Sequence, residues 1–289
     1  MNSDKKPGSG TDLSDWLEAA FRHSEEGRWD EVFRILRDAE VEYPEDPGLL
    51  CMLGVASDQA EVGGLAYEYY RRSLAGQPTD PIVLVQLGAG LARYDDPEAE
   101  GVLRLAALSA PGMAAARLEY GAFLAREGMT ELALEELSAA RELAPEDPRV
   151  GREMSVALLL AGRSDEGADE LERSLSIDPD EGEVLLLHGL ALIQATRVDE
   201  AAEELYRAAE MLVEDGEAQL LSALACATQE WWDQAWDALA RADQAPRQPP
   251  AEVTREVEDA LEGGAGESRS LLEEHLGPSI LRERLLERI

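Results

Sequence analysis

The side chains most often used in catalysis are few in this 289-residue chain. There are three histidines, His23, His188 and His275, and two cysteines, Cys51 and Cys226. Nucleophilic and metal-assisted enzymes bring such groups together with an oriented base or with further metal ligands. None of these five residues falls in a motif with that spacing. We therefore predict no catalytic residue, no metal site and no cofactor, and we expect that the protein is not an enzyme.

Two other patterns resemble binding sites but have a structural explanation. Gly88-Ala89-Gly90 looks like part of a phosphate-binding loop, yet it lies within an expected helix and no strand precedes it. Acidic pairs such as Glu135-Glu136 and Glu203-Glu204 fit solvated helix faces, whereas a calcium loop alternates acidic residues around a glycine. The histidines are likewise expected to be structural, with His188 at a core leucine position.

The chain is strongly acidic, with 61 acidic and 26 basic residues and a net charge of −35. Such a surface repels the phosphates of nucleic acids and anionic membranes and attracts a basic partner. Adaptation to a salty host is an alternative reason for the acidity. Residues 1–12 are polar, and no apolar run approaches the roughly 18 residues of a membrane span. We expect a cytoplasmic protein with a disordered N-terminal tail at residues 1–12 and neither nucleic acid nor membrane as a partner.

A period of about 34 residues runs through most of the sequence. Prolines mark it at Pro44, Pro78, Pro111, Pro145 and Pro179. This period is typical of a helix–turn–helix unit, and a proline placed after the second helix ends that helix. An array of such units is therefore expected, and each unit contains two helices.

Small residues keep the same phase and predict where two helices approach closely. They recur in the middle of each first helix, at Ala20, Gly54, Gly88, Gly121, Ser155, Gly189 and Ala223. They recur near the end of each second helix, at Ala39, Ser73, Ala106, Ala140, Ser174, Ala208 and Ala242. Large apolar residues such as Tyr70, Leu103 and Leu205 alternate with them and are expected to fill the space between the helices.

This pattern resembles the tetratricopeptide-repeat (TPR) family. In the second unit the family's residues read Leu50, Leu53-Gly54, Ala66, Tyr70, Ser73 and Pro78. Seven units are in phase, at 13–46, 47–80, 81–113, 114–147, 148–181, 182–215 and 216–249. The resemblance implies an all-α fold, a right-handed α-solenoid of about seven TPR repeats over residues 13–249. Arg117 and Gly151 depart from the pattern, because the family usually has a bulky aromatic residue or leucine there.

The residues after the repeats are expected to close the array. Residues 250–262 predict a capping helix with one apolar face, formed by Val253, Val257, Ala260 and Leu261. A glycine-rich hinge follows at residues 263–266. Residues 267–289 predict an amphipathic helical tail. That tail is either one more helix packed at the end of the array or a segment that docks in a groove, its own or that of a neighbouring copy.

In the TPR family the first helix of each pair lines a concave face on which ligands lie. The resemblance places these residues on that face: Leu17, Phe21, Val55, Val85, Ala89, Arg93, Leu118, Ala122, Arg126, Arg149, Arg152, Val156, Leu186, Leu190, Ile193, Leu220 and Leu224. Most are apolar, so a helical or extended segment with apolar anchors is expected to cover them. The arginines would either pair with a carboxylate of the ligand or offset the acidic charge around them.

The resemblance implies an interaction scaffold or adaptor that binds a partner polypeptide in the groove. One alternative is a self-assembling structural protein in which residues 267–289 dock on a neighbouring copy. Another is a regulatory subunit of a separate enzyme.

Overall fold

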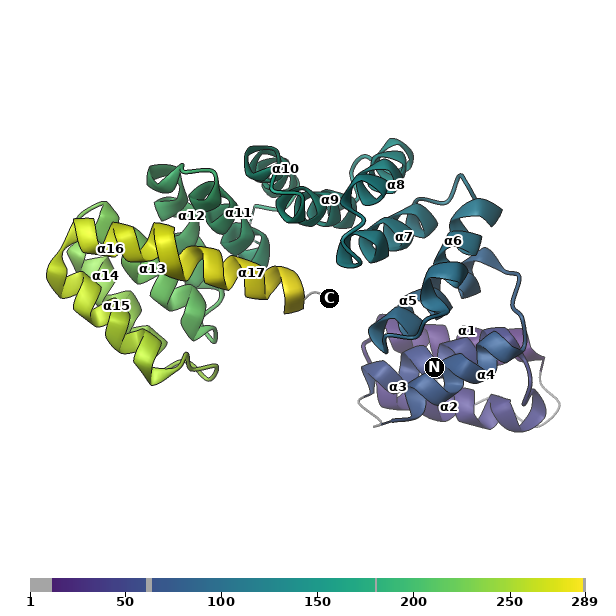
Figure 1. Ribbon diagram of the computed structural model, residues 1–289. Coiled ribbons are helices and arrows are strands. Elements are labelled where there is room, and N and C mark those ends of the chain that lie inside the picture. Colours follow the sequence, from purple (N-terminus) through teal and green to yellow (C-terminus); the bar gives the residue numbers. More distant parts are fainter. Residues whose placement is uncertain (1–11, 61–63, 180, 288–289) are drawn as a thin grey trace. The chain divides into compact units, whose positions relative to one another are not determined.

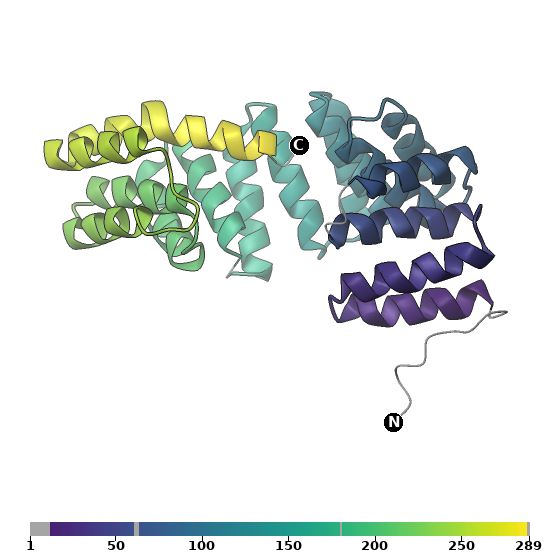
Figure 2. The same cartoon turned by 90° about the horizontal axis from the view of Figure 1, so that it is seen from below.

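A computed structural model describes residues 12–60, 64–179 and 181–287 of the chain. These residues form helices joined by short turns, together with one isolated β-bridge between Asp215 and Arg247. The chain divides into two compact units, Met1–Phe123 and Leu124–Ile289 (Figures 1 and 2). The predicted N-terminal tail falls almost entirely outside the described residues, of which Asp12 is the first.

Each expected repeat contains two helices, which confirms the predicted all-α architecture. In the N-terminal unit they are α1 (Leu13–Glu25), α2 (Trp29–Glu42), α3 (Pro47–Gln59), α4 (Leu65–Ala75), α5 (Pro81–Arg93) and α6 (Ala99–Ser109). The fourth repeat contains α7 (Ala114–Arg126), in which the two units divide, and α8 (Thr130–Leu143). The C-terminal unit continues with α9 (Pro148–Leu160), α10 (Ser164–Ile177), α11 (Gly182–Gln194), α12 (Val198–Met211), α13 (Gly216–Thr228) and α14 (Trp232–Ala242).

The predicted close approach of paired helices is present. A Cβ atom added at Gly54 would lie 2.6 Å from Cδ1 of the Tyr70 ring, and one added at Gly88 would lie 2.7 Å from Cδ2 of Leu103. Carbon atoms in contact are normally about 3.5–4.0 Å apart, so no side chain larger than hydrogen fits at either place. The Tyr70 ring also lies against Gly90 of the following repeat, and it is buried between the two glycines.

Aspartates begin several of the first helices. The side chains of Asp46, Asp80 and Asp147 accept hydrogen bonds from backbone N–H groups in the first turn, at 2.8, 2.8 and 3.0 Å. A proline occupies the first turn of each of these helices, where its missing N–H costs nothing. Each Asp-Pro pair therefore fixes the start of a repeat.

The turn inside the repeat uses a left-handed backbone conformation. The residues at the equivalent position have a φ between +51° and +73°: Gly27, Asp95, Gly128, Gly162, Thr196 and Glu230. Glycine adopts this conformation without steric cost, whereas a β-branched residue such as Thr196 is strained there.

A C-terminal segment follows the repeats. The capping helix α15 (Ala251–Gly263) ends at Gly264, whose φ of +97° no other residue type would readily adopt. The expected four-residue hinge is thus a break at Gly264 alone. The chain then forms α16 (Ala265–Leu271), the π-helical turn η1 (Leu272–Leu276) and α17 (Gly277–Glu287), which together we call the C-terminal tail. The tail lies across α13 and α11 of the same unit, as both views show in yellow (Figures 1 and 2).

Candidate polypeptide-binding surfaces

The predicted ligand face of the N-terminal unit is partly open to water. We call it the N-terminal face and define it by Leu17, Phe21, Val55, Val85 and Ala89, on helices α1, α3 and α5. The side chain of Phe21 is 58 % exposed, and the other four residues are half-buried. An apolar surface in contact with water gains free energy when a ligand covers it.

The next two predicted residues, Leu118 and Ala122 of α7, are buried and offer little surface to a ligand.

A polar network lies beside the N-terminal face, with the carboxylate of Asp58 at its centre. Asp58 accepts hydrogen bonds from the hydroxyls of Tyr70 and Tyr94, at 2.9 and 2.6 Å, and Nη1 of Arg93 lies 3.1 Å from it. Burial and the hydrogen bond to Asp58 raise the pKa of Tyr94 to about 12, and the pKa of Tyr70 is raised for the same reasons. Both hydroxyls therefore remain donors at neutral pH, and Arg93 already has a carboxylate partner within the chain.

The predicted arginines of the C-terminal unit also meet carboxylates of this chain. Nη2 of Arg149 lies 2.7 Å from Asp147, and Nη1 of Arg152 lies 2.9 Å from Glu181. Arg126 is half-buried on α7. These pairs favour the second explanation of the arginines, in which they offset local acidic charge, because an acidic chain places a carboxylate within reach of most cations.

The predicted ligand face of the C-terminal unit, which we call the C-terminal face, is not accessible. Its residues are all at most 4 % exposed: Val156, Leu186, Leu190, Ile193, Leu220 and Leu224. Apolar side chains of the tail belong to the same core: Leu271, Leu272, Ile280, Leu281 and Leu285. At Gly277 the tail approaches so closely that an added Cβ atom would lie 3.2 Å from Cγ2 of Ile193. The open groove expected here is thus filled by the chain's own tail, which removes these leucines from water.

One buried arginine fixes the tail at its far end. Arg284 of α17 is 6 % exposed, and its Nη2 lies 2.6 Å from Asp215 and 2.8 Å from Glu217. A third carboxylate, of Glu183, lies 4.0 Å from its Nη1. Burial alone would lower the pKa of Arg284, but the hydrogen bond to Asp215 and the nearby carboxylates raise it, so the guanidinium stays charged. None of these four residues belongs to the ligand face predicted from the sequence.

Three of the residues considered first for catalysis, His188, Cys51 and Cys226, are buried. His188 is buried, which lowers its pKa, and its Nδ1 is 3.8 Å from Glu204. Both cysteines are free and buried, and burial raises the pKa of Cys51 to about 12. Within the described residues no cluster of three His, Cys, Asp or Glu side chains is arranged to hold a metal ion. No helix in that part of the chain is long and apolar enough to cross a membrane.

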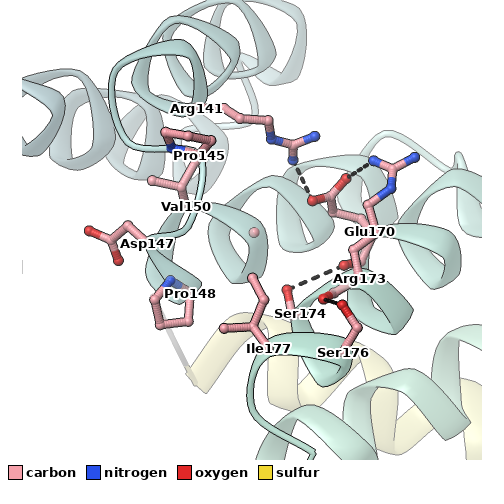
Figure 3. Close-up of a pocket in the computed structure, with 11 residues that line it drawn as sticks. Arg141, Pro145, Asp147, Pro148, Val150, Glu170, Arg173, Ser174, Ser176 and Ile177 are labelled. Carbon is pink, nitrogen blue, oxygen red and sulfur yellow. Dashed lines mark hydrogen bonds and ion pairs between the residues drawn. The ribbon is translucent and has the colours of Figure 1, made fainter.

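A hollow of about 260 Å³ opens beside Gly151 of α9 (Figure 3). The buried carboxylate of Glu170 lies on its wall, paired with Arg141 and, at 2.8 Å, with Arg173. Apolar side chains complete the wall: Pro145, Pro148, Val150 and Ile177. Because the charged groups are already paired with one another, we assign no ligand to this hollow.

No protein-family model matches the chain, and no curated protein matches it. Many solved structures do, and those with the highest probability are TPR proteins. PilF of Pseudomonas aeruginosa is 20 % identical, with a TM-score of 0.61 over 74 % of this chain and 96 % of that one. PilW, a type IV pilus biogenesis factor, is 18 % identical, with a TM-score of 0.62 over 69 % and 94 %. A chain of the Cut9–Hcn1 complex is 16 % identical, with a TM-score of 0.65 over 96 % and 50 %. At these identities the likeness concerns the fold.

Proposed function

Because this chain has the tetratricopeptide-repeat fold, we propose that it is a non-enzymatic scaffold that binds a segment of another polypeptide on its N-terminal face. The observation that supports this role is the partial exposure of the apolar side chains there. The equivalent side chains of the C-terminal unit are covered by the tail, whereas Phe21, Val55 and Val85 remain in contact with water. A helical or extended segment with apolar anchors, flanked by basic residues that match the net charge of −35, would suit this surface. We expect this binding to occur in the cytoplasm.

The alternative of self-assembly through the tail has less support, since the tail is seated on its own chain. Its apolar side chains and Arg284 are already buried there. A copy that donated its tail to a neighbour would first have to leave these contacts.

The test compares two exposed apolar residues of the first repeat. Phe21→Glu changes the N-terminal face, and Val41→Glu, at a side chain 82 % exposed on α2, is the matched control. Full-length wild type and both variants are used to capture proteins from host lysate, and bound proteins are quantified by mass spectrometry. We expect a discrete partner to be captured by wild type and Val41→Glu and to fall at least tenfold with Phe21→Glu. Equal capture by all three proteins would contradict the proposal.

A further inference from the structure

The sequence of the tail has a low intrinsic tendency to form a helix. Its middle is a π-helical turn, Leu272–Leu276, which is followed directly by Gly277 and Pro278. Glycine is among the least favourable residues in a helix, proline lacks the N–H that a helix interior needs, and π-turns are rare. Contact with α11 and α13 must therefore supply much of the free energy that keeps the tail helical.

The surface beneath the tail has a definite chemistry. It is a stripe of leucine and isoleucine side chains that ends in a group of carboxylates, Glu183, Asp215 and Glu217. These carboxylates come from the first turns of α11 and α13 and from the residue that caps α13. The side chains of Asp215 and Glu217 are 10 % and 23 % exposed, and two carboxylates with so little access to water repel each other, so this end of the surface favours a cation. Arg284 supplies that cation through its two short contacts, and Nη1 of Arg247 lies farther away, at 4.0 Å from Asp215.

The order of residues in the tail matches this surface. Ile280 and Leu281 precede Arg284 by four and three positions, and Leu285 follows it; all four side chains are buried. Residues three and four apart lie on one side of a helix, so a single stripe presents apolar side chains together with the guanidinium. Arg282, between them, is exposed.

We propose that the C-terminal face is a docking surface for an amphipathic helix of another protein, with an arginine at the position of Arg284, and that the tail occupies it as an internal competitor. A partner helix without the π-turn and the Gly-Pro pair would lose less free energy on ordering and could replace the tail. The single residue Gly264, between α15 and α16, would let the tail move away while the capping helix stays in place. This surface is separate from the N-terminal face, so either proposal can fail without the other.

The probe is a fluorescein-labelled peptide of residues 265–289, titrated into full-length protein. The proteins are wild type, Arg284→Ala, which loses the buried cation, and Arg282→Ala, the matched control on the exposed side of the same helix. We expect the Arg284→Ala chain to bind the peptide at least tenfold more tightly than wild type or Arg282→Ala does. The peptide that itself carries Arg284→Ala should bind that chain at least tenfold more weakly than the unmodified peptide. Equal binding by the three chains would overturn the proposal and leave the tail as a permanent part of the core.

Arg284→Ala could also unfold the tail helix itself, so a second measurement tests displacement of the tail without that substitution. A protease site inserted after Gly264 in the full chain leaves every contact of the tail in place until it is cut. After cleavage, the labelled peptide should exchange with the native tail and be released again by excess unlabelled peptide. No exchange at a hundredfold excess would overturn the proposal.

Two further experiments test what binds to the C-terminal face: the mass of the protein in solution, and the selection of binding peptides from a library. Sedimentation of wild type should show a monomer, because a concentration-dependent dimer that disappears with Arg284→Ala would assign the surface to a second copy of this chain. A displayed library of helical peptides, selected on the cleaved protein, should be enriched in arginine with apolar residues three and four positions before it. Selection of peptides without arginine would contradict the proposed chemistry.

Discussion

Replacement of Gly90 by alanine tests the packing that holds the second and third repeats together. The added Cβ atom would lie 2.6 Å from Cε1 and from Cε2 of Tyr70, about 1 Å closer than carbon atoms normally approach. The ring cannot move aside easily, because Gly54 lies on its other side and its hydroxyl is bound to Asp58 at 2.9 Å. Overpacking of this kind costs about 1–3 kcal/mol, and loss of the Tyr70–Asp58 hydrogen bond costs about 1 kcal/mol more. Alanine has a higher helix propensity than glycine, which offsets about 1 kcal/mol of this cost.

Gly90→Ala should therefore lower the free energy of unfolding by about 1–3 kcal/mol. The matched control is Gly101→Ala on α6, where an added Cβ meets no atom within 4 Å and only the propensity gain of up to about 1 kcal/mol remains. Urea unfolding measures the free energy of unfolding of both variants, and hydrogen exchange measures the local stability of α3–α5. The reasoning is refuted if Gly90→Ala is as stable as Gly101→Ala. Tyr70→Leu should cost less in the Gly90→Ala background than in wild type, because it removes the ring atoms that the added Cβ would meet.

Three further predictions follow from single residues. Because burial lowers the pKa of His188, the unfolded chain takes up its proton at a higher pH than the folded chain, and stability is lost as the pH falls below 6.5. His188→Leu should remove this loss, so its advantage over wild type in the free energy of unfolding, measured with urea, should grow from pH 7 to pH 5 by at most about 1.4 kcal/mol per pH unit; a constant difference would show that the histidine does not titrate in this way. Thr196→Gly should stabilise the protein by up to about 1 kcal/mol by relieving a φ of +61°, and Gly162→Thr, at the equivalent position, should destabilise it by about 1–2 kcal/mol; equal melting temperatures would count against the strain. Cys51 and Cys226 should react with a thiol reagent far more slowly in native than in unfolded protein, since both are buried with raised pKa values; rapid native labelling of either one would contradict the packing.

The helix pairs could be predicted because several independent signals share one period. The prolines after the second helices and the small residues such as Gly54 and Gly88 all recur at about 34 residues. Each signal has a local cause: proline ends a helix, and glycine permits close approach. A departure in one unit is outweighed by the other units, so the pairs of helices follow from the sequence.

The partners of individual charged side chains could not be predicted in this way. Arg93 lies opposite Asp58, 35 positions earlier in the chain, and Arg284 reaches Asp215, 69 positions away. Such pairs depend on the rotation of each helix and on the path of the tail, neither of which follows from a repeat period. The hollow beside Gly151 lies at a departure that the sequence does reveal, but the pairing of Arg141 with Glu170 across it depends on three-dimensional contact.

The coverage of the C-terminal face does have a signal in the sequence, namely the composition of α11. Every residue from Val184 to Ile193 is buried in the structure, on all sides of the helix. A helix that is apolar on every side must be covered on every side. The first and second helices of the repeats form two layers, which leave one side of α11 uncovered, so a third layer is required. The tail provides that layer.

The same reasoning applied to α5 explains why a partner is expected at the N-terminal face. Its sequence, PIVLVQLGAGLAR, is almost as apolar as that of α11, yet Val85 and Ala89 are only half-buried and Ile82 is 58 % exposed. Two helices with the same pattern thus have different cover, because the tail lies on α11. The free energy that covering α11 contributes within the chain remains available at α5 to a ligand, at roughly 25 cal/mol per Å² of apolar surface removed from water. Unchanged partner capture by Phe21→Glu would contradict this expectation.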